Sequence, residues 1–257
     1  MNTLIICEGP SDQILLSYYL CKRYNLSWKK DLDLLPGMPP GTPQPALYAN
    51  DEHSLVIMPA GSVTQLAHTL RCALDTLKKN TPAWTFSNLI LLFDHDSDKE
   101  STQLLSDFSS SVRSFSPTAA DLRPQVLMAC EIELAFGEFL TLNLMPLPLP
   151  EHGDGALETF LFNELSQHSE NELLCAESSA FIERLLELKA QGCNFPYLHT
   201  RRLQVKAPLS VFFAVFSPER VFEKMDCLLR SIPWEEYLKH NRAFRLFDRF
   251  FSASQAE

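Results

Sequence analysis

Residues 89–100, LILLFDHDSDKE, pass from a run of apolar side chains directly into three aspartates at alternate positions. The apolar run over 88–93 predicts a buried strand, because a strand of a parallel sheet that is covered on both faces is apolar throughout. Asp94, Asp96 and Asp98 follow it with no Lys or Arg between them. Like charges this close repel, so the pattern predicts either a bound cation or full exposure to water.

Short apolar runs alternate with amphipathic segments along the first half of the chain. We expect strands at 3–7, 54–58, 88–93 and 125–129, and helices at 11–24, 61–79 and 98–110. Repeated βα units with right-handed crossovers predict an α/β fold, in which helices flank a mostly parallel sheet. The Pro-rich segment 36–45 is expected to be irregular. Residues 130–139 are expected to form a helical turn before a second Pro-rich stretch at 144–150.

The pattern changes after residue 145. Helical periodicity dominates from there, at 155–168, 170–190, 208–215, 218–231 and 233–251. We therefore expect an α/β domain over 1–145 and a mainly helical extension over 146–257, packed on the sheet. Basic residues of the last segment are interleaved with Phe244, Phe247 and Phe250. This spacing predicts an amphipathic helix docked on the core, with a basic face that is either solvated or in contact with a partner.

Composition limits the possible classes of protein. A chain of 257 residues with 46% hydrophobic residues can bury a large core. It has no apolar run of about 20 residues and no signal-peptide pattern, so we expect no membrane span and a cytoplasmic location. The seven cysteines form no CxxC pair and are expected to be reduced. A net charge of −10 argues against a broad basic nucleic-acid surface, but not against an enzyme that meets phosphates through metal ions.

Acidic residues follow three of the expected strands. Glu8 and Asp12 follow the first, the Asp94 group the third, and Glu131 and Glu133 the fourth. Each has an ordinary explanation: Glu8 would favour the positive end of the next helix, Asp12 would cap it, and the Asp94 group would be a solvated turn. Because ligands of parallel sheets gather beyond the carboxyl ends of the strands, their coincidence predicts one binding site.

The residue types narrow what such a site would bind. A calcium loop of the EF-hand type is excluded, because Lys99 stands where Gly is needed and Leu105 where a bidentate Glu is needed. The sequence contains neither a P-loop nor a GxGxxG fingerprint. Carboxylates without His or Cys partners suit hard cations such as Mg²⁺ or Mn²⁺. His95 is expected to point away from its two neighbours and to pack rather than to bind metal.

The acidic segments resemble a known family. EGPSD at 8–12, after LIIC, and DHD at 94–96, after LILLF, resemble the Glu and DxD motifs of Toprim domains. Toprim domains are the metal-binding catalytic units of topoisomerases, bacterial primases and overcoming-lysogenization-defect (OLD) nucleases. CEIELAF at 130–136 is similar to the IExxL stretch of OLD-like proteins. GALETFLF at 155–162 and VKAPLSVFFA at 205–214 resemble stretches of small standalone Toprim proteins.

This resemblance spans about residues 3–215 and implies a metal-dependent nuclease that hydrolyses phosphodiester bonds in DNA or RNA. Two metal ions can together orient the attacking water, neutralise the phosphate and stabilise the leaving oxygen. Glu158 lies on an expected amphipathic helix, where an exposed Glu needs no special explanation, so the ordinary reading is favoured over a role in the site. The implied catalytic residues are Glu8, Asp94, Asp96 and Lys206, and the implied ligands of Mg²⁺ or Mn²⁺ are Glu8, Asp12, Asp94, Asp96 and Glu133.

The chain also departs from parts of the family. It shows no topoisomerase-like Tyr context, no zinc-binding module as in primases, and no preceding ATPase as in full-length OLD proteins. Two hypotheses stay open. One is a nuclease, acting alone or as the effector of an ATPase-coupled anti-phage defence system. The other is a non-catalytic or partner-dependent Toprim module that assembles with an ATPase subunit.

Overall fold

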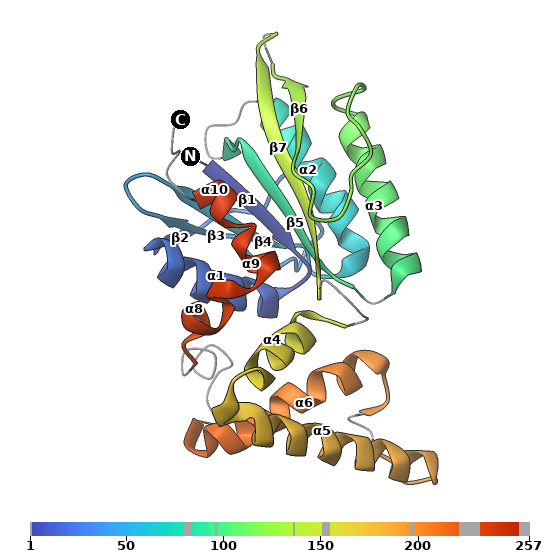
Figure 1. The fold of residues 1–257 in the computed structure, drawn as a ribbon. Helices are drawn as coiled ribbons and strands as arrows, with labels where there is room; N and C mark the ends of the chain where they lie inside the picture. Colours follow the sequence, from blue (N-terminus) through green and yellow to red (C-terminus); the bar gives the residue numbers. More distant parts are fainter. Residues whose placement is uncertain are drawn as a thin grey trace.

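Figure 1 shows the computed structural model, which describes residues 2–79, 84–95, 97–135, 137–150, 155–195, 198–220 and 232–251. Seven strands of this part of the chain form one sheet in the order β2-β3-β4-β1-β5-β7-β6. β4, β1, β5 and β7 are parallel, whereas β3 and β6 run antiparallel to their neighbours. The strands are β1 (Asn2–Cys7), β2 (Ser27–Asp31), β3 (Ala46–Ala49), β4 (Ser54–Pro59), β5 (Asn88–Asp94), β6 (Met128–Glu133) and β7 (Phe139–Leu149). The expected α/β fold with a mostly parallel sheet is confirmed.

Helices cover both faces of the sheet. Along β1, Ile5 and Cys7 pack with α1 (Pro10–Tyr24), whereas Leu4 and Ile6 pack on the opposite face with α2 (Leu66–Lys78) and α3 (Asp98–Arg113). This alternation follows from the two-residue period of a strand. A short 3-10 helix, η1 (Val63–Gln65), precedes α2. The helices expected at 11–24, 61–79 and 98–110 are therefore confirmed, with small shifts at their ends.

Three helices pack together beyond the carboxyl ends of the parallel strands (Figure 1). They are α4 (Leu157–Ser166), α5 (Ser169–Ala190) and α6 (Arg201–Phe216), and η4 (Pro218–Arg220) follows them. Most of the helix expected over 218–231 lies outside the described residues. β7 runs through the expected boundary at 145–146. Its last residues, up to Leu149, therefore lie in the region that was expected to be helical.

The segment 233–251 is not one amphipathic helix, as the spacing predicted. It forms four short helical turns, and they run back over α1 (Figure 1). Its phenylalanines are nevertheless buried in the core, as expected. The turns are α8 (Trp234–Tyr237), η5 (Leu238–His240), α9 (Arg242–Arg245) and α10 (Asp248–Phe251).

The fourth strand was predicted wrongly. Instead of a parallel strand at 125–129 and a helical turn over 130–139, the chain forms a β-hairpin of β6 and β7. Gly137 lies in its turn with φ at +79°, a conformation that favours glycine. The Pro-rich stretch at 144–150 lies mostly in β7, which extends to Leu149 and pairs with β5 from Asn143 onward. β2 and β3 were also missed, although the Pro-rich segment between them is irregular, as expected.

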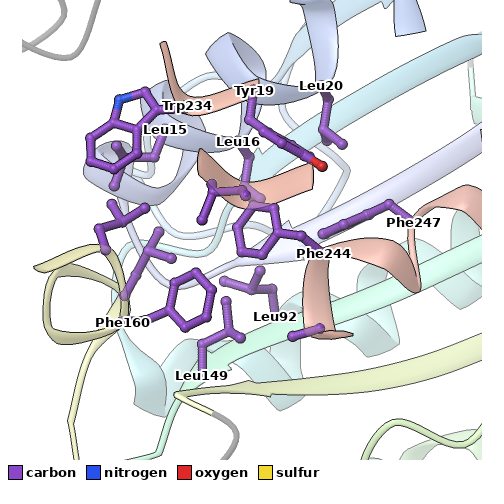
Figure 2. Close-up of a cluster of buried hydrophobic side chains, with 14 of the residues drawn as sticks. Leu15, Leu16, Tyr19, Leu20, Leu92, Leu149, Phe160, Trp234, Phe244 and Phe247 are labelled. Carbon is purple, nitrogen blue, oxygen red and sulfur yellow. The ribbon is translucent and has the colours of Figure 1, made fainter. Parts of the chain in front are cut away.

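An aromatic cluster ties the C-terminal turns to α1 and α4. The Phe244 ring stacks on Phe160 of α4 at a centroid distance of 5.1 Å and meets Tyr19 of α1 edge-on at 4.7 Å. Figure 2 shows Phe244 between these two rings, with Leu92 and Leu149 of the sheet nearby. Aromatic pairs of this kind add to the stabilisation from buried area. The cluster thus joins three segments that are distant in the sequence.

No helix in the described part of the chain is both long enough and apolar enough to cross a membrane.

We expect Phe244→Ala to lower the free energy of unfolding by about 3–5 kcal/mol, because it leaves a cavity between two aromatic rings. Phe244 is 2% exposed, whereas Phe181 on α5 is 52% exposed. Phe181→Ala is therefore the matched control and should change stability by about 0.5 kcal/mol or less. Urea titrations of the three proteins measure both values. Equal losses in the two variants would contradict this account of the core.

Candidate functional site

The ends of β1 and β5 bring two acidic residues together. The two strands are parallel neighbours in register, with Ile6 opposite Leu91. Glu8 follows β1 directly, and its Oε1 accepts a hydrogen bond of 2.9 Å from the backbone N–H of Asp94 at the end of β5. The two residues are 86 positions apart in the chain. The expectation that these two strand ends meet at one edge of the sheet is therefore confirmed.

Asp12 is buried in the first turn of α1, beside Glu8 and Asp94. Its Oδ2 accepts a hydrogen bond of 2.8 Å from the backbone N–H of Gly9, the N-cap residue of the helix. Asp12 therefore caps the helix and also adds a negative charge near Asp94. We call Glu8, Asp12 and Asp94 the acidic cluster.

The first residue of α4 fixes the side chain of Asp94. The Oδ1 atom of Asp94 accepts a hydrogen bond of 3.0 Å from the backbone N–H of Leu157, which is the first residue of α4. The positive end of a helix stabilises a negative charge at this position. The helical region thus contacts the acidic cluster through the first residue of α4.

Burial and mutual repulsion act strongly on the acidic cluster. The pKa of Asp94 is raised to about 8, chiefly by burial and also by the charges of Glu8 and Asp12, against a lowering by the Leu157 N–H. The pKa of the neighbouring Cys7 thiol is raised well above its ordinary value by burial and by the same carboxylates. Removing the like charges from the neighbourhood or adding a cation would favour the ionised form of Asp94.

Lys206 is not an ordinary surface lysine. It forms an ion pair with Glu158 in the first turn of α4, and their side chains are only 22% and 13% exposed. The Glu158 charge is close enough to contribute to the raised pKa of Asp94. The structure therefore places this ion pair beside the acidic cluster, where the resemblance implied a role for Lys206.

Glu133 does not join the acidic cluster. β6 runs antiparallel to β7. Its carboxyl end therefore lies beside the amino ends of the parallel strands, at the opposite end from Asp94. Glu133 pairs with Phe139, whereas Asp94 pairs with Leu149, ten residues further along β7. At about 3.3 Å per residue this corresponds to roughly 33 Å. The expectation that Glu133 shares a metal with Asp94 is therefore wrong.

The remaining residues of the DHDSD stretch have different positions. Asp96 lies outside the described residues. Asp98 is fully exposed in the first turn of α3, and its Oδ1 lies 3.1 Å from Nε2 of the half-buried His95. The backbone N–H of His95 donates to Leu149 O, which extends the pairing of β5 and β7 by one residue. His95 therefore pairs with Asp98 rather than with the acidic cluster.

The donor chemistry of the acidic cluster suits a hard divalent cation, because every side-chain donor in it is a carboxylate oxygen. Among the residues that the structure describes, however, no three His, Cys, Asp or Glu side chains converge closely enough to hold a metal ion. One oxygen of each carboxylate instead accepts a backbone N–H, which fixes the orientation of the three side chains.

Two partners of the cluster were not predicted. The Leu157 N–H belongs to the backbone and leaves no signature in the sequence. Glu158 was left open because an acidic residue in the first turn of a helix is common. The GALETF stretch, at the start of a helix that follows a sheet strand, is the one signal in the sequence that could have placed Glu158 near the carboxyl ends of the strands.

Comparisons with known proteins identify no family. No family model matches the chain, and no curated protein matches it. Among solved structures, the chain is similar to the crystal structure of the hypothetical protein PH0156 from Pyrococcus horikoshii OT3. The similarity has a TM-score of 0.47 and 14% sequence identity, and it covers 96% of this chain and 98% of the other.

The raised pKa of Asp94 predicts a pH-dependent stability in metal-free buffer. Between the unfolded pKa of about 4 and the folded pKa of about 8, the folded protein retains a proton that the unfolded chain has lost. Stability should therefore fall as pH rises through this window, by at most about 1.4 kcal/mol per pH unit. Asp94→Asn keeps an oxygen to accept the Leu157 N–H and should remove this contribution.

Urea titrations at several pH values between 5 and 8, in the presence of a chelator, measure the effect. The variant should gain stability relative to the wild type as pH rises. A difference between the two proteins that stays constant over this range would show that Asp94 has an ordinary pKa.

Proposed function

We propose that the protein is a divalent-metal-dependent nuclease that hydrolyses phosphodiester bonds in DNA or RNA. The observation that carries the proposal is the 2.9 Å contact between Glu8 Oε1 and the Asp94 amide, which joins acids from two adjacent strand ends. Glu8 and Asp94 are also the first residues of the two segments that resemble Toprim motifs. The contact and the resemblance therefore both support a site at the carboxyl ends of β1 and β5.

The ligands of the proposed Mg²⁺ or Mn²⁺ are Glu8, Asp12 and Asp94, with Asp96 added on the resemblance alone. A bound divalent ion supplies charge neutralisation for the phosphate and lowers the pKa of a coordinated water. The raised pKa of Asp94 is consistent with this role, because burial and the charges of Glu8 and Asp12 disfavour its ionised form when no cation is present. The chain itself holds the carboxylates in place through backbone N–H groups.

Lys206 is the proposed cation for the substrate. Its ammonium group can offset negative charge on a phosphate beside the acidic cluster, and Glu158 holds it there. A lysine fixed by a largely buried partner keeps its position better than a solvated one.

A partner-dependent form of this function has its own support. The chain carries a net charge of −10, which disfavours strong binding of nucleic acid by the chain alone. On α5, Leu173 is 73% exposed and Phe181 is 52% exposed, so the helical region presents apolar side chains to a possible subunit. We therefore include an ATPase partner, as in anti-phage defence systems, as the second candidate.

A cytoplasmic location is part of the proposal. Cys7, Cys72, Cys130 and Cys175 are buried free thiols in the structure, and reduced thiols are typical of the cytoplasm.

The proposal predicts Mg²⁺- or Mn²⁺-dependent cleavage of nucleic acid. Glu8→Gln and Asp94→Asn should each lower the rate at least about 100-fold, since loss of an outer-shell partner alone typically costs roughly 10- to 100-fold. Both variants preserve the side-chain acceptors for backbone N–H groups. Cleavage of labelled single- and double-stranded DNA and RNA, with metal and with chelator, measures the rates.

Glu133→Gln separates the structural assignment from the sequence-based one. Because Glu133 lies at the opposite edge of the sheet, this variant should cleave at the wild-type rate. Cleavage that survives Asp94→Asn would reject the proposed site. Inertness of the pure protein, with cleavage appearing only after an ATPase subunit is added, would favour the second candidate.

A further inference from the structure

A cavity of about 170 Å³ lies beside the acidic cluster, between α1, α4 and α6. Ser11 and Leu15 line it from α1, and Glu158 lines it from α4. Ser11 directly precedes Asp12, and Glu158 directly follows Leu157, whose N–H is bonded to Asp94. The cavity is therefore adjacent to the proposed metal site and separate from the acidic cluster itself.

One face of α6 forms the opposite wall of the cavity. Lys206, Leu209, Ser210 and Phe213 line it and are spaced three or four residues apart, as residues on one side of a helix are. Leu209 and Phe213 are buried, so this wall is mainly apolar and includes an aromatic ring. Lys206 provides the positive charge at the end nearest Glu158.

The size of the cavity limits its occupant to one ring. An apolar protein cavity of roughly 150 Å³ can hold a benzene molecule, whereas sites for drug-sized ligands begin at roughly 300 Å³. The volume here, about 170 Å³, is close to the first value. The cavity is therefore close to the size that holds a single six-membered ring, and a fused two-ring system is larger than such a ring.

An unsatisfied acceptor gives the cavity a polar preference. Glu158 Oε1 pairs with Lys206, but the buried Oε2 has no hydrogen-bond partner among the described residues. A buried carboxylate oxygen without a partner is unfavourable. A ligand that donates an N–H to Oε2 would remove this cost, and Lys206 beside it can donate to a ring oxygen or nitrogen.

We propose that this cavity is a binding pocket for the pyrimidine base of the nucleotide whose phosphate lies at the acidic cluster. The inference rests on the proposed nuclease function, since that function places a nucleotide here. A pyrimidine is a single ring that stacks on aromatic side chains and carries N–H donors and acceptors on one edge. Leu209 and Phe213 provide the apolar wall against which the ring packs, the Glu158 carboxylate accepts the N–H, and Lys206 donates to the neighbouring acceptor.

Uncharged nucleosides test the pocket without relying on catalysis. Cytidine, uridine, adenosine and guanosine are titrated into the full chain with chelator present, and the methyl signals of Leu15 and Leu209 are followed by NMR. We expect saturable shifts with the two pyrimidine nucleosides. The purine nucleosides should bind at least about 10-fold more weakly, because their fused two-ring bases are larger than the single ring that a cavity of this size holds well.

Matched serine variants show where the nucleoside binds. Ser210 is exposed on α6, and its hydroxyl donates to the carbonyl of Lys206, four residues earlier. Ser110 is exposed on α3, and its hydroxyl makes the same bond to Ser106. Ser210→Phe should abolish the shifts by filling the pocket, whereas Ser110→Phe should leave them unchanged. Glu158→Gln should weaken binding about 10-fold, because a carboxylate accepts more strongly than an amide.

The outcomes separate the two proposals. Absence of shifts at both leucines up to the solubility limit, equal binding of purines and pyrimidines, or undiminished binding by Ser210→Phe would each overturn the pocket. Pyrimidine binding in a protein that cleaves no nucleic acid, either alone or with an ATPase subunit, would reject the proposed function and retain the pocket. Cleavage of nucleic acid without pyrimidine binding would reject the pocket and retain the proposed function.

Discussion

The parallel, in-register pairing of β1 with β5 is the constraint on which the rest of the site depends. It places Glu8 and Asp94 at one edge of the sheet, 86 residues apart in the chain but within one hydrogen bond. Burying carboxylates beside one another is unfavourable, and the apolar packing on both faces of these strands provides the stability that holds them there. The amide of Leu157 and the first turn of α1 then fix the directions of the side chains.

The part of the fold that could be predicted is the part with strong local signals. β1, β4 and β5 are apolar runs, and amphipathic helices follow them. β7 was missed because Pro146 and Pro148 argue against a strand within a sheet. The structure shows why they are tolerated: the pairing with β6 ends at Leu144, so beyond that residue β7 has a strand on one side only. β2 was missed because all five of its side chains are exposed and give no periodic pattern.

The candidate site was predictable wherever it follows from strand direction. Glu8, Asp12 and Asp94 meet as expected because β1 and β5 are parallel. The prediction for Glu133 was wrong because the direction of β6 depends on a tight hairpin turn, whereas the sequence pattern indicates a helical turn there. A strand of reversed direction has its carboxyl end at the opposite end of the parallel strands. The position of Glu158 depends on the packing of α4 against α6, which is tertiary information that no local pattern carries.

The return of the C-terminal turns over α1 affects the order in which the molecule can be completed during synthesis. Tyr19 and Leu20 of α1 reach their final surroundings only when Phe244 and Phe247 are in place, and Asp248 accepts hydrogen bonds from Arg23 and Tyr24. The ribosome adds these partners after every residue of the acidic cluster. A nascent chain that already carries every residue of the acidic cluster therefore still lacks the cover of the helix that contains Asp12.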